Sequence, residues 1–203
     1  YGYCTGDYMK TNQWINPGEG YNTDGSTVFW TWNNGSPMDA ADMESEGIDD
    51  EDGAYGLKLF FQSRGYTVVD CFNQQIEEEG LPSGFSFDQY KAYIDAGKPV
   101  LIQVTNHTMV GYGYNEGPAD TIYIHDTWDY NNHRMVWAGT YDGLQHYGVA
   151  VVTLQASTIN VWDGSYNNYW GNAPNWSLGH VPTSTETVVI PDLNMPVIVD
   201  YSD

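Results

Sequence analysis

The chain has 203 residues, with 27 Asp and Glu against only 6 Lys and Arg, and its formal net charge at pH 7 is -21. A surface of this sign repels the phosphates of nucleic acids and anionic lipid headgroups, so we expect neither as a partner. The length suffices for a well-buried core, and no apolar run approaches the length of a membrane span.

Strong acidity is typical of secreted proteins, of proteins from salty habitats and of calcium binders, and it also simply raises solubility. Frequent Tyr, Trp, Asn and Gly with scarce Lys favour an extracellular or cell-surface location. We expect no organic cofactor, and calcium is the ion that the composition would suit. An EF-hand before Gly53 is excluded, because Ile48 and Leu59 would occupy its first and twelfth ligand positions.

The first quarter of the chain is rich in turns, with a strand predicted over residues 27–32. The acidic run over residues 39–52 predicts a solvated loop. A short helix is expected over residues 55–64, with Gly65 in the position of a C-terminal cap. A strand is expected over residues 66–69.

Ser86 has the side chain of a helix N-cap, and residues 87–96 predict a helix that ends at Gly97. Strands are then predicted over residues 100–104, 108–114, 121–125, 135–138 and 146–154. Helices followed by a meander of strands predict an α+β domain with an antiparallel sheet and two short helices, over residues 1–155.

Residues 156–203 differ in character, because no helix is predicted there. Tryptophans are spaced among Asn, Gly and Pro, and strands are predicted over residues 187–191 and 196–199. We expect a separate, short, β-rich C-terminal module or linker.

The two cysteines are Cys4 and Cys71. An even count in an oxidising compartment suggests one disulfide bridge, which would close a long loop and contribute about 3–4 kcal/mol in the chain-entropy model. Two buried free thiols are the alternative.

The predicted strands place His107 at the start of one strand and Asp126 at the tip of a neighbouring one. A histidine oriented by a carboxylate is half of a nucleophilic triad, in which the imidazole takes a proton from Ser or Cys. A structural or exposed histidine is the competing interpretation. A metal cluster of His107, Asp126 and His146 is a further alternative, although its spacing is not diagnostic.

Three blocks, over residues 95–102, 107–114 and 123–128, resemble the second half of bacterial C39-like cysteine peptidases of the papain-like superfamily. Residues 1–13 and 56–66 also resemble secreted members of that group. The resemblance implies a papain-like half, hydrolysis of peptide bonds in a peptide or protein substrate, His107 as general base and Asp126 as its orienting partner.

The family carries its nucleophilic cysteine on a helix upstream of the block that begins here at Tyr1, together with the Gln of the oxyanion hole. We therefore expect a domain truncated at its N-terminal side, whose thiolate would come from a companion fragment or another polypeptide. Cys4 lies in the block that follows the catalytic helix, and Gly2 and Gly6 disfavour a helix around it. Cys4 as the nucleophile is the weaker alternative.

Residues 162–164, 175–184 and 187–191 resemble a β module of large secreted bacterial surface proteins. Such a module serves as a spacer or, through exposed β edges, as an element of self-association. The rival to a peptidase is thus a non-catalytic extracellular structural or assembly protein, a surface layer or fibre built on a degenerate peptidase fold.

Overall fold

The structure is a computed structural model that describes residues 4–11, 25–77, 81, 83–155, 158–191 and 196–199. The chain divides into two compact units, Tyr1–Leu154 and Gln155–Asp203, each of which is described by itself. Across the described residues, no helix has the length and apolarity needed to cross a membrane.

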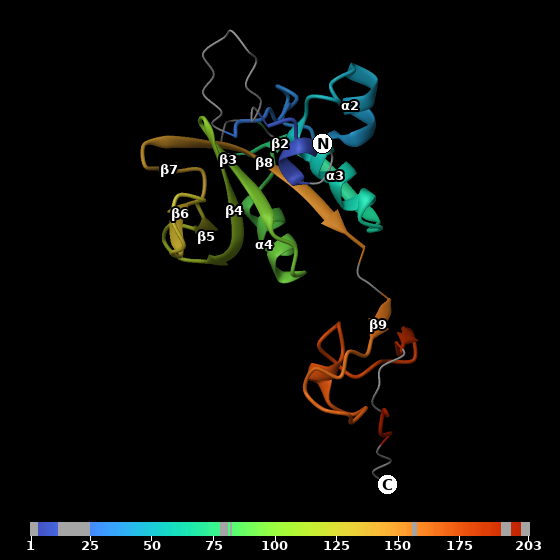
Figure 1. Cartoon of the computed structure of the whole chain (residues 1–203). Helices are drawn as coiled ribbons and strands as arrows, with labels where there is room; N and C mark the ends of the chain where they lie inside the picture. Colours follow the sequence, from blue (N-terminus) through green and yellow to red (C-terminus); the bar gives the residue numbers. More distant parts are fainter. Residues whose placement is uncertain are drawn as a thin grey trace. The chain divides into compact units, whose positions relative to one another are not determined.

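The first unit is built on an eight-stranded sheet in which all neighbouring strands are antiparallel (Figure 1). Its order is β1-β2-β8-β3-β4-β5-β6, and β7 pairs with β8 off this path. The strands are β1 (Met38–Asp39), β2 (Val68–Gln75), β3 (Val100–Val104), β4 (His107–Asn115), β5 (Thr121–His125), β6 (His133–Val136), β7 (Thr140–Tyr141) and β8 (Leu144–Leu154). A mostly antiparallel sheet with few short helices is compatible with the predicted α+β class.

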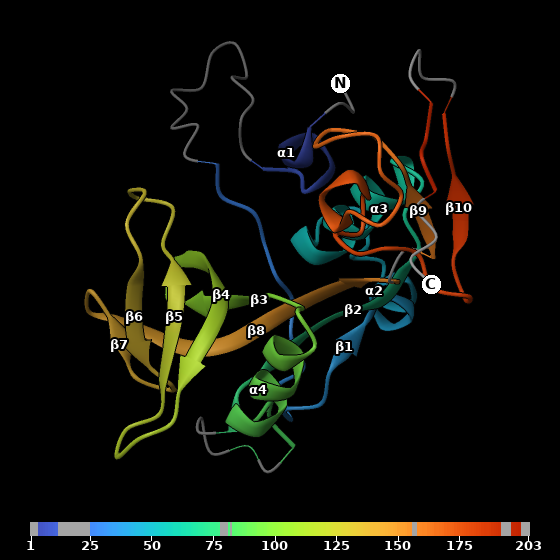
Figure 2. The ribbon, with the colours of Figure 1, turned by 90° about the horizontal axis from the view of Figure 1, so that it is seen from below.

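Helices cover both faces of this sheet. They are α1 (Thr5–Tyr8), α2 (Ala40–Glu46), α3 (Gly53–Ser63) and α4 (Phe87–Asp95). Figure 2 shows α4 on one side of β2 and β8, and α1 and α3 on the other. Because side chains alternate along a strand, Ile102 packs into the larger core on the α4 side, whereas Leu101 packs beneath α3.

Several predicted elements lie where the sequence places them. Strands β3 and β5 have the predicted bounds. Helix α4 begins after Ser86, whose hydroxyl accepts a hydrogen bond from the Gln89 amide while the Gln89 side chain accepts from the Ser86 amide. This capping box explains why the helix starts there.

Two local predictions are wrong. Residues 27–32 form no strand and contribute only an isolated bridge from Val28 to Asp52. Part of the acidic run forms α2 instead of a loop, because Asp39 and Asp42 form a capping box at its start. The charge of the run predicts a loop, whereas the capping pattern within it favours a helix.

The expected bridge between Cys4 and Cys71 is absent, since both thiols are free. Cys4 is exposed and occupies the N-cap position of α1. Cys71 is buried in β2 against Ala54 and Ala150. Burial is the main cause that raises the pKa of the Cys71 thiol to about 12, so this group is held in the unreactive thiol form.

Asp52 is a buried carboxylate that joins three separate segments. Its Oδ1 accepts hydrogen bonds from the amides of Ala54 and Tyr55 and so caps α3. Its Oδ2 accepts from the Trp30 amide at 2.8 Å and from Asn73 Nδ2 of β2 at 2.7 Å. Burial raises the pKa of Asp52 despite these four bonds, so the carboxylate depends on them.

We predict that Asp52→Ala lowers the free energy of unfolding by about 3 kcal/mol, because it removes a helix cap and leaves buried donors without acceptors. Urea denaturation followed by tryptophan fluorescence measures the loss. Asp50→Ala, at an exposed position of the same acidic run, is the matched control and should change stability by less than about 0.5 kcal/mol. A loss below about 1 kcal/mol for Asp52→Ala would contradict this role.

His146 is fully buried in β8. Its Nδ1 accepts a hydrogen bond from the Ala138 amide, and its Nε2 donates to the Gly148 carbonyl. The Trp137 ring meets the imidazole edge to face at 4.7 Å. Burial lowers the pKa of His146 to about 4, so the ring is neutral in the folded protein.

The unfolded chain binds a proton at this residue below about pH 6.5, and the folded protein does so only near pH 4. Stability should therefore fall as the pH falls through this window, by about 3 kcal/mol from His146. Urea denaturation at pH 7 and pH 4 should show a smaller difference for His146→Gln than for the wild type. The exposed His125→Gln is the control, and an unchanged difference in His146→Gln would refute the assignment.

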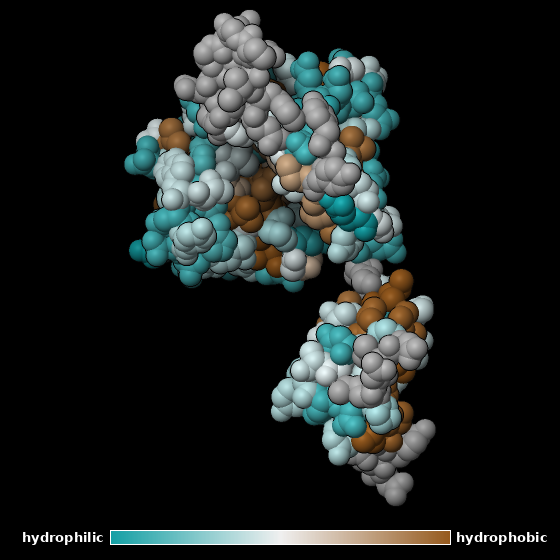
Figure 3. All heavy atoms as spheres, viewed as in Figure 1, coloured by the Kyte–Doolittle hydropathy of each residue, from teal (hydrophilic) through white to brown (hydrophobic). Residues whose placement is uncertain are grey.

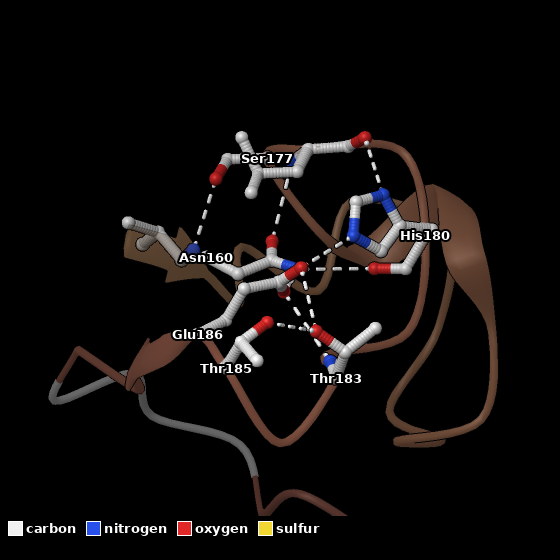
Figure 4. Close-up of polar contacts among 8 residues, drawn as sticks. Asn160, Ser177, His180, Thr183, Thr185 and Glu186 are labelled. Carbon is white, nitrogen blue, oxygen red and sulfur yellow. Dashed lines mark hydrogen bonds and ion pairs between the residues drawn. The ribbon is translucent and has the colours of Figure 1, made fainter. Parts of the chain in front are cut away.

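The second unit contains β9 (Ile159–Val161) and β10 (Thr187–Val189), which pair in parallel, and a 3-10 turn, η2 (Ala173–Asn175). The strand predicted over residues 196–199 forms only an isolated bridge at Ile198. Trp162 and Trp176 are buried. Asn160 is also buried, and its amide group donates to the carbonyl of His180 and to the carboxylate of Glu186 (Figure 4).

Candidate active site

His107 is the first residue of β4 and pairs with Val104 at the end of β3. The two strands are joined by a tight turn in which Asn106 has φ of 61°, a left-handed conformation that Asn tolerates better than most residues. This turn brings the imidazole against the end of β5, where Nε2 lies 2.6 Å from the main-chain carbonyl oxygen of Asp126.

The sequence predicts that the Asp126 carboxylate contacts His107. The structure gives this carboxylate other hydrogen-bond partners. Its Oδ2 accepts a hydrogen bond from the Tyr141 hydroxyl at 2.6 Å, and its Oδ1 accepts from the Trp128 amide at 3.1 Å. His133 Nε2 lies 3.5 Å from Oδ2. The structure thus brings residues 107 and 126 together through the main chain, because the side chain of Asp126 is held by other donors.

The Asp126 side chain is only 3% exposed. Burial opposes its charged form, but the hydrogen bonds from Tyr141 and Trp128 and the nearby His133 outweigh this effect and lower the pKa of Asp126. The carboxylate is therefore ionised at neutral pH.

The carbonyl contact assigns the tautomer of His107. A carbonyl oxygen only accepts hydrogen bonds, so Nε2 must carry the proton and donate it. Nδ1 is then left with a free lone pair, which is the state required of a general base. The main-chain oxygen of Asp126, and not its carboxylate, is the group that contacts His107.

An aromatic stack fixes the orientation of the His107 ring. The Trp128 ring stacks on it with a centroid distance of 4.6 Å, and Tyr141 stacks on Trp128 at 5.8 Å. Sequence reasoning did not assign roles to these two residues. Trp128 lies two positions after Asp126, whereas Tyr141 comes from β7, and nothing local in the sequence marks it.

A cavity of about 930 Å³ lies beside His107. Its lining comes from α1, from residues 25–29 and from the β3–β4 hairpin, and includes Thr5, Gly6, His107 and Thr108. Apolar side chains are visible in a hollow of this unit in Figure 3. Cys4 itself is not among the lining residues, although the helix that it caps is.

Within the described parts of the chain, one group of three metal-ligating side chains comes together: Asp126, Asp129 and His133, whose ligand atoms lie within 4.8 Å of one another. A hydrogen bond of 2.8 Å joins His133 Nε2 to Asp129 Oδ1. This bond is the main cause that raises the pKa of His133. The contacts of the His133 imidazole with both carboxylates account for the group, and the alternative cluster of His107, Asp126 and His146 is not formed.

A family model described as "Peptidase_C39 like family" matches residues 19–149. The chain belongs to this family. The matched region contains both His107 and Asp126 as well as the whole sheet from β1 to the middle of β8. The searches of curated proteins and of solved structures returned no match.

The hydrogen bond from Tyr141 to the Asp126 carboxylate can be tested through the pKa of Asp126. We predict that Tyr141→Phe raises the pKa of Asp126, because it removes the strongest hydrogen bond to the ionised form. The midpoint is measured by following the Asp126 carboxyl carbon by NMR during a pH titration. Tyr130→Phe is the control, since Tyr130 is fully exposed. An unshifted midpoint in Tyr141→Phe would rule out the proposed hydrogen bond.

Proposed function

We propose that this chain contains a secreted C39-like cysteine peptidase domain, with a papain-like arrangement, that hydrolyses peptide bonds with His107 as its general base. The observation that carries the proposal is the His107–Asp126 contact, which leaves Nδ1 free beside a cavity. The family membership supports the reaction class. The acidic composition supports an extracellular location.

In the proposed reaction, Nδ1 of His107 accepts the proton of a cysteine thiol, and the thiolate attacks the substrate carbonyl. The imidazolium then gives its proton to the departing amine, and a thioester remains. Water, deprotonated by the same nitrogen, hydrolyses the thioester and regenerates the thiol. The ionised Asp126 stabilises the imidazolium through its charge, and Trp128 holds the ring in place.

The thiol of this reaction is proposed to come from a segment outside residues 1–203, on a companion fragment or another polypeptide that docks at the cavity beside His107. Cys71 is unsuited, because it is buried under α3 and its pKa is raised to about 12. Cys4 is exposed at the start of α1, and Thr5 and Gly6 of that helix line the cavity. Cys4 is therefore the second candidate for the nucleophile.

A peptidyl probe that alkylates active-site thiols, applied to the native preparation, tests the proposal. We expect intact-mass analysis to find the label on an associated polypeptide. His107→Gln should lower the labelling rate at least ~100-fold, in line with the usual contribution of a general base. His180→Gln, in the second unit, is the control and should label at the wild-type rate.

Cys4→Ser separates the two sources of the thiol. Labelling that survives in Cys4→Ser supports a nucleophile from outside this chain, and labelling that disappears assigns it to Cys4. Unlabelled native material would overturn the catalytic proposal. The non-catalytic structural or assembly protein would then stand in its place, favoured by the Asp126 carboxylate, which bonds to Tyr141 and Trp128 and not to His107.

A further inference from the structure

Thr127 has a backbone conformation that β-branched residues rarely adopt. Its φ angle is 69°, in the left-handed region, where the Cβ atom of an L-residue lies too close to the following carbonyl oxygen. Among the described residues other than glycine with positive φ, Thr127 alone is β-branched. In such a residue this angle is an outlier that the surrounding structure has to impose.

Contacts on both sides of Thr127 impose this conformation. The Asp126 carboxylate accepts a hydrogen bond from the Trp128 amide at 3.1 Å, across Thr127, and another from the Tyr141 hydroxyl at 2.6 Å. The Trp128 ring is held in turn by its stacking on His107. The residues before and after Thr127 are thus anchored, whereas Thr127 itself is exposed.

The φ angle of Thr127 sets the direction of the peptide group that joins it to Asp126. A trans peptide is planar, and its carbonyl and its amide point in opposite directions. Because the carbonyl oxygen lies 2.6 Å from Nε2 of His107, the Thr127 amide points away from the ring. Rotating this peptide by half a turn, with its neighbours held, returns φ of Thr127 to the negative values that β-branched residues prefer.

The rotated peptide presents an N–H group to His107 in place of the carbonyl. An N–H group only donates, so Nε2 then has to accept through its lone pair, and the proton of the neutral ring belongs to Nδ1. The exchange conserves protons, because Nε2 loses one to water and Nδ1 gains one from water. The two orientations of this single peptide therefore select the two tautomers of the imidazole.

We propose that the peptide between Asp126 and Thr127 is a two-state switch that sets the tautomer of His107, with Thr127 as its positioning residue. The observed orientation leaves Nδ1 free to accept a proton, and the rotated orientation blocks it. Strain at Thr127 favours the rotated state, whereas the bonds of the Asp126 carboxylate favour the observed one, so the two lie close in free energy.

The switch regulates the site described above, and in that sense the inference rests on the proposed function. Thr127 is among the residues that line the cavity beside His107. An occupant of the cavity can therefore contact the switch directly and shift its balance, to the extent that it binds the two orientations with different affinity.

Nitrogen-15 NMR of the 203-residue chain tests the proposal at alkaline pH, at which histidine rings are neutral. Long-range proton–nitrogen correlations show which ring nitrogen carries the proton, and His107→Gln identifies the His107 signals by their loss. We expect both tautomers in the wild type, with the Nε2–H form the major one. Thr127→Gly removes the cost of the left-handed angle, so the ratio of Nδ1–H to Nε2–H should fall about tenfold.

Two variants control for the substitution itself. Thr127→Val keeps a β-branched residue and should keep the wild-type ratio of tautomers. Asp142→Gly relieves a positive φ of 48° at another exposed residue, and it should also leave His107 unchanged. The ring of His180, in the second unit, should give the same signals in every variant. A purely structural role of Thr127 would change stability without moving the proton between the nitrogens of His107.

An equal ratio in the wild type and Thr127→Gly, including the Nε2–H form alone in both, would overturn the proposal. An equal fall in Asp142→Gly would overturn it too. The NMR measurement needs no catalytic thiol, so the two proposals fail separately. Native material that the thiol probe does not label removes the peptidase and leaves the tautomer shift standing, whereas labelled material with equal ratios removes the switch alone.

Discussion

The buried carboxylate of Asp52 accepts four hydrogen bonds from three stretches of chain, and the geometry of the first unit follows from it. The bonds fix where α3 begins and hold it against β2. On α3, Gly56 lies so close to the backbone of Tyr8 and Met9 that a Cβ atom would collide with them. Only glycine therefore lets α1 reach α3, and α1 contributes lining residues to the cavity beside His107.

The candidate site depends on a competition for hydrogen bonds at the end of β5. Tyr141 and Trp128 occupy the Asp126 carboxylate, and the imidazole of His107 takes the main-chain carbonyl of the same residue. The carbonyl only accepts hydrogen bonds, so this contact decides which nitrogen of His107 carries the proton.

The two units deal with the acidity of the chain in different ways. In the first unit, carboxylates serve as helix caps and as partners of histidines, with Asp52, Asp39 and Asp126 as examples. In the second unit, the carboxylate of Glu186 contacts His180 and Asn160.

From the sequence, periodicity and capping residues predicted β3, β5 and α4 and the pair of residues at the site, because these signals are local. The sequence also carried the family resemblance, which the match over residues 19–149 bears out. Residues 27–32 have the composition of a strand but pair with no neighbouring strand beyond the isolated bridge at Val28. The high charge of the acidic run obscured the helix signal of α2. The tertiary structure alone decided that Tyr141, from β7, donates a hydrogen bond to the Asp126 carboxylate, and that Ile198 pairs with Tyr169. Such contacts join residues far apart in the chain, and local sequence preferences do not encode which donor bonds to which acceptor in the folded structure.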